Sequence, residues 1–336
     1  MSRVTSASSR GIGFAAAVIM AVLLAACGTA SASPAASTSS SFKLQSEYVK
    51  LVQDVGPSVV LIETSVGLGS GIIYDAQGDI VTNNHVVAGS QTFLVVSSTG
   101  KQYPATLVGT FAPDDLAVIR VQATGLHPAS FANSSSLQVG DIVMAIGNPL
   151  GLQSSVSQGI VSAMRTAIPE GNGVTLQSVI QTTAAINPGN SGGALVSLNE
   201  QVVGIPTLAA TDPQLGGGAA PGIGFAIPSN TITLIANQLI KTGAVTNSGR
   251  AALGAQVANT GGSGALVTTV KSGGPAALAG IKVGDTIKAI GGKLVTGAQA
   301  VADVLLTLKS GQQVPVNLLH SDGSSSVATV TLTELQ

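Results

Sequence analysis

The stretch QTTAAINPGNSGGALVS, residues 181–197, places Ser191 between glycines on both sides. A serine hydroxyl attacks a carbonyl poorly unless a base takes its proton, and the attack needs backbone N–H groups directed at the developing oxyanion. Glycine permits the tight turn that brings such amides together and leaves room for a substrate carbonyl. The motif therefore indicates a candidate nucleophile at Ser191, although glycine- and serine-rich segments also form ordinary loops.

A candidate base lies upstream of this serine, in TNNHVV at residues 82–87. The chain has three histidines. His127 precedes a proline in a loop-like segment and His320 lies near the C-terminal end, whereas His85 follows a strand-like run. We interpret His85 as the general base; the alternative is a polar residue that ends a strand.

A candidate acid lies between the two, in PDDLAVI at residues 113–119. A buried carboxylate is needed to orient the imidazole and to stabilise its cation. Asp115 directly precedes the apolar run, so we expect its side chain to enter the domain interior, whereas Asp114 is expected to face solvent. The alternative is that both acids belong to a turn. The order His85, Asp115, Ser191 is that of chymotrypsin-type triads.

Short apolar runs separated by Gly, Asn, Asp and Ser dominate the chain before residue 229. Their regular spacing is typical of an all-β sandwich or barrel. The predicted strands lie at residues 58–64, 71–75, 79–84, 92–97, 105–109, 116–121, 141–147, 201–206 and 224–227.

Residues 229–241 (SNTITLIANQLIK) instead repeat apolar side chains with a helical period. Ser229 is the predicted N-cap and Gly243 the predicted stop of this helix. After a linker at 244–250, the remaining residues mix short strands with helical segments near 275–279 and 298–308. We therefore expect one domain at 46–243 and a second at 251–336.

The N-terminal 27 residues are typical of an export signal, because two arginines precede an uncharged run too short to span a bilayer. The run ends in LAAC at Cys27, which resembles the lipobox of bacterial lipoproteins and implies that Cys27 is lipidated. A plain signal peptide or a short anchor is the alternative. Residues 29–41 are small, polar and low in complexity, so a flexible tether is expected over residues 28–45.

Composition excludes several classes of function. The net charge is −1 and there is no basic block, so nucleic-acid binding has no electrostatic support. The single cysteine excludes an intrachain disulfide and a cysteine-rich metal site. Tryptophan is absent and aromatic residues are 3%, so the core is expected to consist of Val, Ile, Leu and Ala.

Four segments in the same order resemble the HtrA/Deg serine proteases: TNNHVV, DDLAVIR, GDIVMAIGNP and QTTAAINPGNSGGALVS. The resemblance implies a mostly β fold, with a chymotrypsin-like double six-stranded β-barrel followed by a smaller α+β PDZ domain. It implies an extracytoplasmic serine endopeptidase that acts on unfolded or misfolded polypeptides, needs neither ATP nor a metal, and assembles as a homotrimer or a multiple of one. His85, Asp115 and Ser191 take the triad roles, and the turn Gly189-Asn190-Ser191 supplies the oxyanion hole.

The resemblance also places a substrate pocket. Its walls are implied to be Ala184, Ala185 and Ile186 on one side and Phe225, Ala226 and Ile227 on the other. Because these side chains carry no charge, a charged substrate residue would be left unpaired, and cleavage after small aliphatic residues is expected. The chain departs from the family pattern at Thr183, where aspartate is usual, and at Pro188, where a basic residue is usual.

The segment LVTTVKSGGPAALAGIKVGDTIKAIGGK, residues 266–293, looks like a PDZ domain, and Leu253-Gly254-Ala255 matches the family's carboxylate-binding loop. Such domains bind peptide C-termini as an added strand. The alternative is an α+β packing module without a ligand. For the whole chain, two other functions stay open: a chaperone-like peptide-binding protein with a latent protease domain, and a membrane-tethered scaffold that uses only the PDZ domain.

Overall fold

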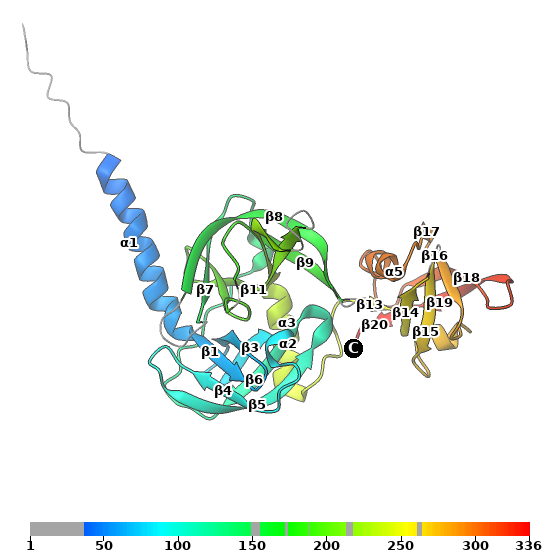
Figure 1. Ribbon diagram of the computed structural model, residues 1–336, viewed down its shortest axis with the longest axis horizontal. Coiled ribbons are helices and arrows are strands. Elements are labelled where there is room, and N and C mark those ends of the chain that lie inside the picture. The colour runs from blue at the N-terminus through cyan, green and yellow to red at the C-terminus, as the bar shows by residue number, and fades with distance from the viewer. Residues whose placement is uncertain (1–36, 149–154, 172–173, 188, 213–217, 261–263) are drawn as a thin grey trace, which may run out of the picture. The chain divides into compact units, whose positions relative to one another are not determined.

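The structure is a computed structural model that describes residues 37–148, 155–171, 174–187, 189–212, 218–260 and 264–336. The chain divides into a unit of residues 1–46 and a unit of residues 47–336. The larger unit contains two closed six-stranded β-barrels followed by a smaller α+β domain (Figure 1). The mostly β fold predicted from the sequence is confirmed.

The first barrel closes in the strand order β1-β2-β3-β6-β5-β4. Alternate side chains of its strands, among them Ile62, Ile80 and Ile119, are fully buried in its interior. All of the strands predicted for this part of the chain are present, with shifted bounds. They are β1 (Val59–Thr64), β2 (Leu68–Ile73), β3 (Asp79–Asn83), β4 (Phe93–Val96), β5 (Gln102–Phe111) and β6 (Leu116–Val121).

The second barrel closes in the order β10-β11-β12-β9-β8-β7. Three of its strands, β8, β9 and β10, were not predicted, since β8 mixes small polar with apolar residues and has no apolar run. The strands are β7 (Ile142–Gly147), β8 (Ser155–Gly171), β9 (Val174–Thr182), β10 (Ala194–Ser197), β11 (Val202–Asp212) and β12 (Gly218–Pro228).

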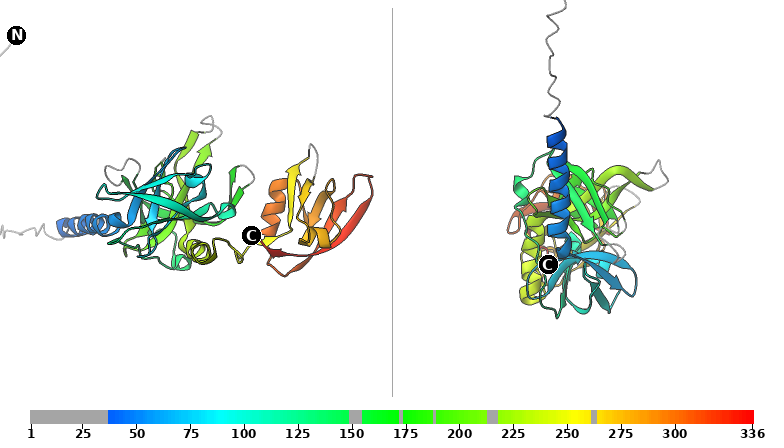
Figure 2. Two further views of the ribbon diagram at one scale, coloured as in Figure 1. Left: turned by 90° about the horizontal axis from the view of Figure 1, so that it is seen from below. Right: turned by 90° about the vertical axis from the view of Figure 1, so that its left-hand side faces the viewer.

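A large apolar cluster joins the two barrels. It combines Val81 and Val118 of the first barrel with Ile146 and Ile205 of the second. Helix α3 (Ser229–Thr242) packs on both barrels through buried side chains of the same cluster (Figure 2). The barrels are therefore fixed against each other by shared apolar burial.

The helix at 229–242 confirms one predicted end and corrects the other. Gly243 ends it in the left-handed conformation (φ 73°), and its amide donates to Leu239 O at 2.8 Å. The N-cap, however, is Pro228, and Ser229 is the first helical residue. The Ser229 hydroxyl donates to Ala132 O at 2.7 Å, so a tertiary partner replaces the predicted capping bond.

Helix α1 (Ser37–Val55) begins within the segment 28–45, for which a flexible tether was expected. Residues 28–36 lie outside the described part of the chain. The reason is a tertiary one: Leu51 and Val55, near the end of the helix, are buried in the core of the larger unit. Burial of these two side chains stabilises the C-terminal end of the helix, and the helix extends from there back through the residues of low complexity.

The C-terminal domain has a core of its own and a six-stranded sheet in the order β14-β15-β16-β18-β19, with β17 paired to β16. Strands β13 and β20 form a separate pair. Both predicted helical segments are confirmed, as α4 (Pro275–Leu278) and α5 (Ala298–Leu305). The strands are β13 (Ala251–Ala252), β14 (Ala255–Asn259), β15 (Ala265–Val270), β16 (Thr286–Ile290), β17 (Lys293–Leu294), β18 (Gln313–Leu319), β19 (Ser325–Thr331) and β20 (Thr333–Glu334).

Among the residues that the structure describes, no helix is both long enough and apolar enough to cross a membrane.

A partly buried ion pair joins strands β3 and β6 of the first barrel. Asp79 of β3 is 1% exposed, and Nε and Nη2 of Arg120, opposite it on β6, donate to its two carboxylate oxygens at 2.8 Å each. Burial raises the pKa of the Asp79 carboxyl, while the hydrogen bonds from Arg120 act in the opposite direction.

We expect Arg120→Ala to lower the free energy of unfolding by about 3 kcal/mol at neutral pH, because a buried carboxylate loses its partner. A folded-state pKa above the unfolded one means that folding favours the protonated acid, so this deficit should shrink as the pH falls through the folded-state pKa of Asp79. Urea unfolding at several pH values measures it. Arg165→Ala, which removes an exposed hydrogen bond to Gln181, is the matched control; a deficit that is independent of pH would contradict the expectation.

Candidate functional site

The three residues predicted as a triad come from three separate elements. His85 lies in the short helix α2 (Asn84–Val87) that follows β3, and Asp115 directly precedes β6. Ser191 lies in the turn before β10 of the second barrel. The site therefore forms where the two barrels meet, and neither barrel contains it alone.

His85 and Asp115 are joined by two hydrogen bonds. The ring Nδ1 of His85 lies 2.8 Å from Asp115 Oδ2, and the backbone amide of His85 donates to Asp115 Oδ1 at 2.9 Å. The Asp115 side chain is 4% exposed and that of His85 is 44% exposed. The carboxylate thus fixes the start of α2 as well as the ring, and leaves the other edge of the imidazole accessible.

Backbone conformation directs Asp115 into the interior, as predicted. Asp115 has φ 50° and ψ 43°, a left-handed conformation that aspartate tolerates better than most residues. It ends a 3₁₀ turn, Ala112–Asp114, and its carbonyl accepts hydrogen bonds from the Asn84 amide (3.0 Å) and from Asn83 Nδ2 (3.1 Å). The residue is held from both its side chain and its backbone.

The prediction that Asp114 faces solvent is wrong. Asp114 is 4% exposed, and Nη1 of Arg250 donates to its Oδ1 at 2.6 Å and to Pro113 O at 2.5 Å. Burial raises the pKa of the Asp114 carboxyl and Arg250 opposes that shift. The partner is far away in the sequence, so the local pattern around Asp114 carries no signal of its burial.

Thr207 is a site residue that the sequence analysis missed. It is 3% exposed, and its hydroxyl donates to Asp115 Oδ2 at 2.7 Å. Its carbonyl accepts the hydroxyl of Ser191 at 3.2 Å. Thr207 follows the apolar strand residues 201–206, and a single hydroxyl in a buried strand was the only available signal. It connects the acid to the candidate nucleophile.

The turn that carries Ser191 needs its glycines. Gly189 and Gly192 have φ of +101° and +80°, and a Cβ on Gly192 would lie 2.1 Å from Ser70 O. The amide of Asn190 donates to Asn187 O at 3.0 Å and so is used within the turn. Among the described residues, the amides of Gly189 and Ser191 have no hydrogen-bond acceptor, as an oxyanion hole requires.

The hydroxyl of Ser191 donates to Thr207 O at 3.2 Å. Catalytic hydrogen bonds are often long or poorly aligned before substrate binds. A rotation about χ1 of Ser191 is the movement that would turn the hydroxyl from Thr207 to the imidazole.

The residues predicted to line the substrate pocket are only partly brought together. Ala184, Ile186 and Ala226 share one buried apolar cluster. A Cβ on Gly224 would lie 2.4 Å from Ile186 Cγ1, so the two predicted walls are in contact at this point. The other three residues differ: Phe225 packs with Leu176 and Val179, Ile227 belongs to the cluster between the barrels, and Ala185 is exposed.

Of the two departures from the family pattern, the structure describes one. The hydroxyl of Thr183 accepts the amide of Ile160 at 3.0 Å, and the Thr183 amide donates to Ile160 O at 3.1 Å. Thr183 therefore pairs with strand β8. Pro188 lies outside the described residues.

A second Asp–His–Ser array occurs in the C-terminal domain. His320 Nδ1 lies 2.7 Å from Asp285 Oδ1, and His320 Nε2 lies 2.7 Å from Ser326 Oγ. Ser326 belongs to the regular strand β19, whereas Ser191 belongs to a glycine-rich turn. The turn, rather than the three residue types alone, distinguishes the candidate active site.

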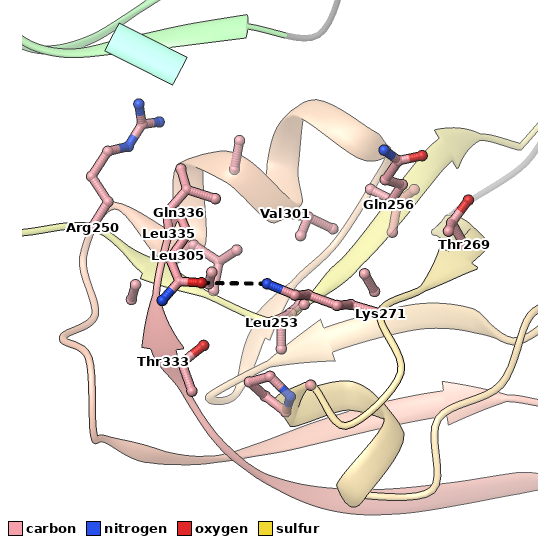
Figure 3. A pocket seen from close by; sticks show the side chains of 18 of the residues that line it. Arg250, Leu253, Gln256, Thr269, Lys271, Val301, Leu305, Thr333, Leu335 and Gln336 are labelled. Atoms are coloured by element: carbon pink, nitrogen blue, oxygen red, sulfur yellow. Dashed lines mark hydrogen bonds between the residues drawn. The ribbon is translucent and has the colours of Figure 1, made fainter. Parts of the chain in front are cut away.

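A cavity of about 1030 Å³ lies at the loop predicted to bind a carboxylate (Figure 3). Leu253, Val301 and Leu305 give it an apolar wall, and Lys271 reaches across it to Gln336 Oε1 at 3.4 Å. Gly254 has φ +71°, and a Cβ there would lie 2.8 Å from Pro275 Cδ. The loop therefore requires glycine for both its conformation and its packing.

Comparison with known proteins identifies a family for each of the two domains. Residues 69–205 match the trypsin-like peptidase domain family and residues 251–332 match the PDZ domain family. The serine protease PepD of Mycobacterium tuberculosis is 39% identical over an alignment of 353 positions that covers 96% of this chain and 75% of that protein. The periplasmic serine endoprotease DegP of Escherichia coli is 39% identical over 267 residues, 76% of this chain and 55% of DegP.

Solved structures give the same assignment. A serine endoprotease from Yersinia pestis matches with a TM-score of 0.61 and 35% identity, covering 86% of this chain and 98% of that one. The HtrA-type protease AlgW, solved with a decapeptide, matches with a TM-score of 0.62 and 28% identity over 86% of this chain and 99% of its own. The chain thus belongs to the family of HtrA-type serine proteases, with a trypsin-like peptidase domain followed by a PDZ domain.

Proposed function

We propose that this HtrA-type protease is an exported endopeptidase that cleaves unfolded or misfolded polypeptides, with Ser191 as nucleophile, His85 as general base and Asp115 as the orienting acid. The observation that carries the proposal is one hydrogen-bonded array. Asp115 accepts bonds from His85 and from Thr207, and Thr207 in turn accepts the hydroxyl of Ser191. A buried acid, an accessible imidazole and a serine in a glycine turn are the parts that acyl transfer needs.

The chemistry follows from this arrangement. Once the Ser191 hydroxyl has turned to His85 Nε2, the imidazole takes its proton as Oγ attacks the scissile carbonyl. Asp115 holds Nδ1–H and stabilises the imidazolium, while the amides of Gly189 and Ser191 donate to the oxyanion. His85 then gives the proton to the leaving amine, and a water molecule, activated by the same imidazole, releases the acyl group from Ser191.

We expect Ser191→Ala to reduce casein degradation by about 10⁵- to 10⁶-fold, because the base and acid cannot act without the nucleophile. The measurement is proteolysis of casein together with labelling by a fluorophosphonate and mapping of the labelled peptide, which should contain Ser191. The variant should fold normally by circular dichroism. Equal degradation by the two proteins, or a label on another serine only, would refute the triad.

Substrate preference is proposed from the pocket walls. Ala184, Ile186 and Ala226 pack together without any charged side chain among them, and Ile186 fills the space beside Gly224. Little room is left for a large residue, and a buried charge would lack a partner. We therefore propose cleavage after small aliphatic residues.

Profiling on a peptide library tests this preference. Cleavage sites should be dominated by Val, Ala and Ile, and Ile186→Ala should extend them toward larger apolar residues because it removes side-chain volume beside Gly224. Dominant cleavage after Arg or Lys in the wild-type profile would show that the pocket lies elsewhere.

We propose that the cavity at Leu253-Gly254-Ala255 binds peptide C-termini. The conformation of Gly254 lets backbone amides converge on a carboxylate, and the apolar side chains of Leu253 and Val301 offer a place for the terminal residue. AlgW, a relative in fold and sequence, has been solved with a decapeptide and with a tripeptide.

A peptide with a hydrophobic C-terminus should bind at submillimolar concentration, and its C-terminally amidated form should bind much more weakly. Gly254→Ala should weaken binding at least tenfold. Gly280→Ala is the matched control, because Gly280 also has a positive φ (+79°) but has open space around its Cβ position. No binding of the free-acid peptide at millimolar concentration would favour a packing module without a ligand.

A second candidate function has one observation in its favour. In the described conformation the hydroxyl of Ser191 donates to a backbone carbonyl, that of Thr207. A chaperone-like protein with a latent protease domain would retain this state, and a scaffold would need only the PDZ domain. Suppression of substrate aggregation that survives in Ser191→Ala would identify the chaperone-like activity alongside or instead of cleavage.

We also propose export and membrane attachment. Cys27 lies outside the described residues, and the proposal rests on the lipobox-like sequence that ends at it. It places the enzyme on the extracytoplasmic side, anchored through lipid on Cys27, and the family resemblance adds a homotrimer or a multiple of one. Mass spectrometry of the mature N-terminus tests the anchor, and an unmodified Cys27 would rule it out.

A further inference from the structure

Ser70 on β2 is fully buried, and its three polar groups, the hydroxyl, the amide and the carbonyl, form four hydrogen bonds. Its hydroxyl donates to Gly189 O at 2.5 Å and accepts the amide of Asn148 at 2.8 Å. Its backbone amide donates to Ser191 O at 2.9 Å, and its carbonyl accepts the hydroxyl of Thr82 at 2.7 Å.

Three of these four bonds cross from the first barrel to the second. Gly189 and Ser191 belong to the turn before β10, and Asn148 directly follows β7. The side-chain bond fixes the peptide that follows Gly189, and the backbone bond fixes the peptide that follows Ser191. Both ends of the turn that presents the candidate oxyanion amides are therefore anchored on one residue.

The neighbours of Ser70 bring this anchor close to the base as well. A Cβ on Gly69 would lie 2.6 Å from Val86 Cγ1, so no side chain separates β2 from the helix that carries His85. Likewise, a Cβ on Gly192 would lie 2.1 Å from Ser70 O. The Gly69–Ser70 segment is thus in direct contact with the helix of the base and with the turn of the nucleophile.

We propose that Ser70 is a positioning residue that holds the Gly189–Ser191 turn with its amides directed at the oxyanion. The inference rests on the proposed endopeptidase function. A rotation of the peptide between Gly189 and Asn190 would break the bond from the Ser70 hydroxyl to Gly189 O. The buried hydroxyl and the buried carbonyl would then be unsatisfied, which is costly. Glycine itself offers little resistance to such a rotation, so the restraint comes from the two hydrogen bonds of this peptide, from the Ser70 hydroxyl to Gly189 O and from the Asn190 amide to Asn187 O.

Loss of this restraint affects the transition state more than substrate binding, because the oxyanion exists only after attack. Removing a direct oxyanion donor costs about 10²–10³ in kcat. Ser70 acts through the turn, so Ser70→Ala should lower kcat per titrated active site by about 10- to 100-fold, while KM for the same peptide changes less than about twofold.

The experiment compares the full-length wild type with Ser70→Ala on a chromogenic peptide that ends in valine. Active-site titration gives the concentration of competent enzyme, so misfolded protein does not count as lost kcat. A peptide aldehyde, which forms a tetrahedral adduct with an oxyanion, should lose affinity by the same factor as kcat. Ser229→Ala is the matched control, since it removes another buried hydroxyl-to-carbonyl bond of similar length far from the turn, and it should leave both quantities unchanged.

Ser70→Cys is the second variant, since a thiol fills nearly the same space and donates only weakly; it should lie between wild type and Ser70→Ala if the alanine variant fails to fold. The positioning role is overturned if kcat per active site of the Ser70 variants is within twofold of wild type, or if Ser229→Ala lowers it equally. If the wild type does not hydrolyse the peptide at all, the proposed function has failed and the positioning role fails with it.

Discussion

The buried carboxylate of Asp115 is the group on which the geometry of the site depends. A charge with 3% exposure is costly unless donors surround it, and here the donors come from the backbone and ring of His85 and from the hydroxyl of Thr207. His85 belongs to the first barrel and Thr207 to the second. Satisfying this one carboxylate completely therefore requires the two barrels to be docked, because the hydroxyl of Thr207 reaches Asp115 only then.

Polar contacts of this kind cross an interface that is otherwise apolar. The shared cluster of buried aliphatic side chains supplies the attraction between the barrels without specifying a register. The bonds of Asp115, Ser70 and Thr207 are directional and tolerate little sliding. The aliphatic cluster thus supplies affinity between the barrels, and the polar groups at its edge supply the alignment that a reacting serine and imidazole need.

The sequence was informative where a local pattern carries the signal. The pairing of His85 with Asp115, the first-barrel strands and the helix before Gly243 could be predicted because each has a motif, an apolar run or a period. Strand β8 could not, because its pattern mixes polar and apolar residues over its length. The burial of Asp114 and the role of Thr207 were not predicted for a different reason. Their partners, Arg250 and Asp115, are distant in the chain, and only the folded structure brings them together.

The pairing of β13 with β20 has a consequence for how the C-terminal domain comes apart. The first strand of the domain is bonded to its last, through Ala251 with Glu334 and Ala252 with Thr333. A force applied between the linker before β13 and the residues after β20 would act on this short ladder before it acts on the main sheet. The ladder would open one residue pair at a time. The ladder joins the first strand of the domain to be synthesised with the last, so it cannot form until every other strand of the domain has been made.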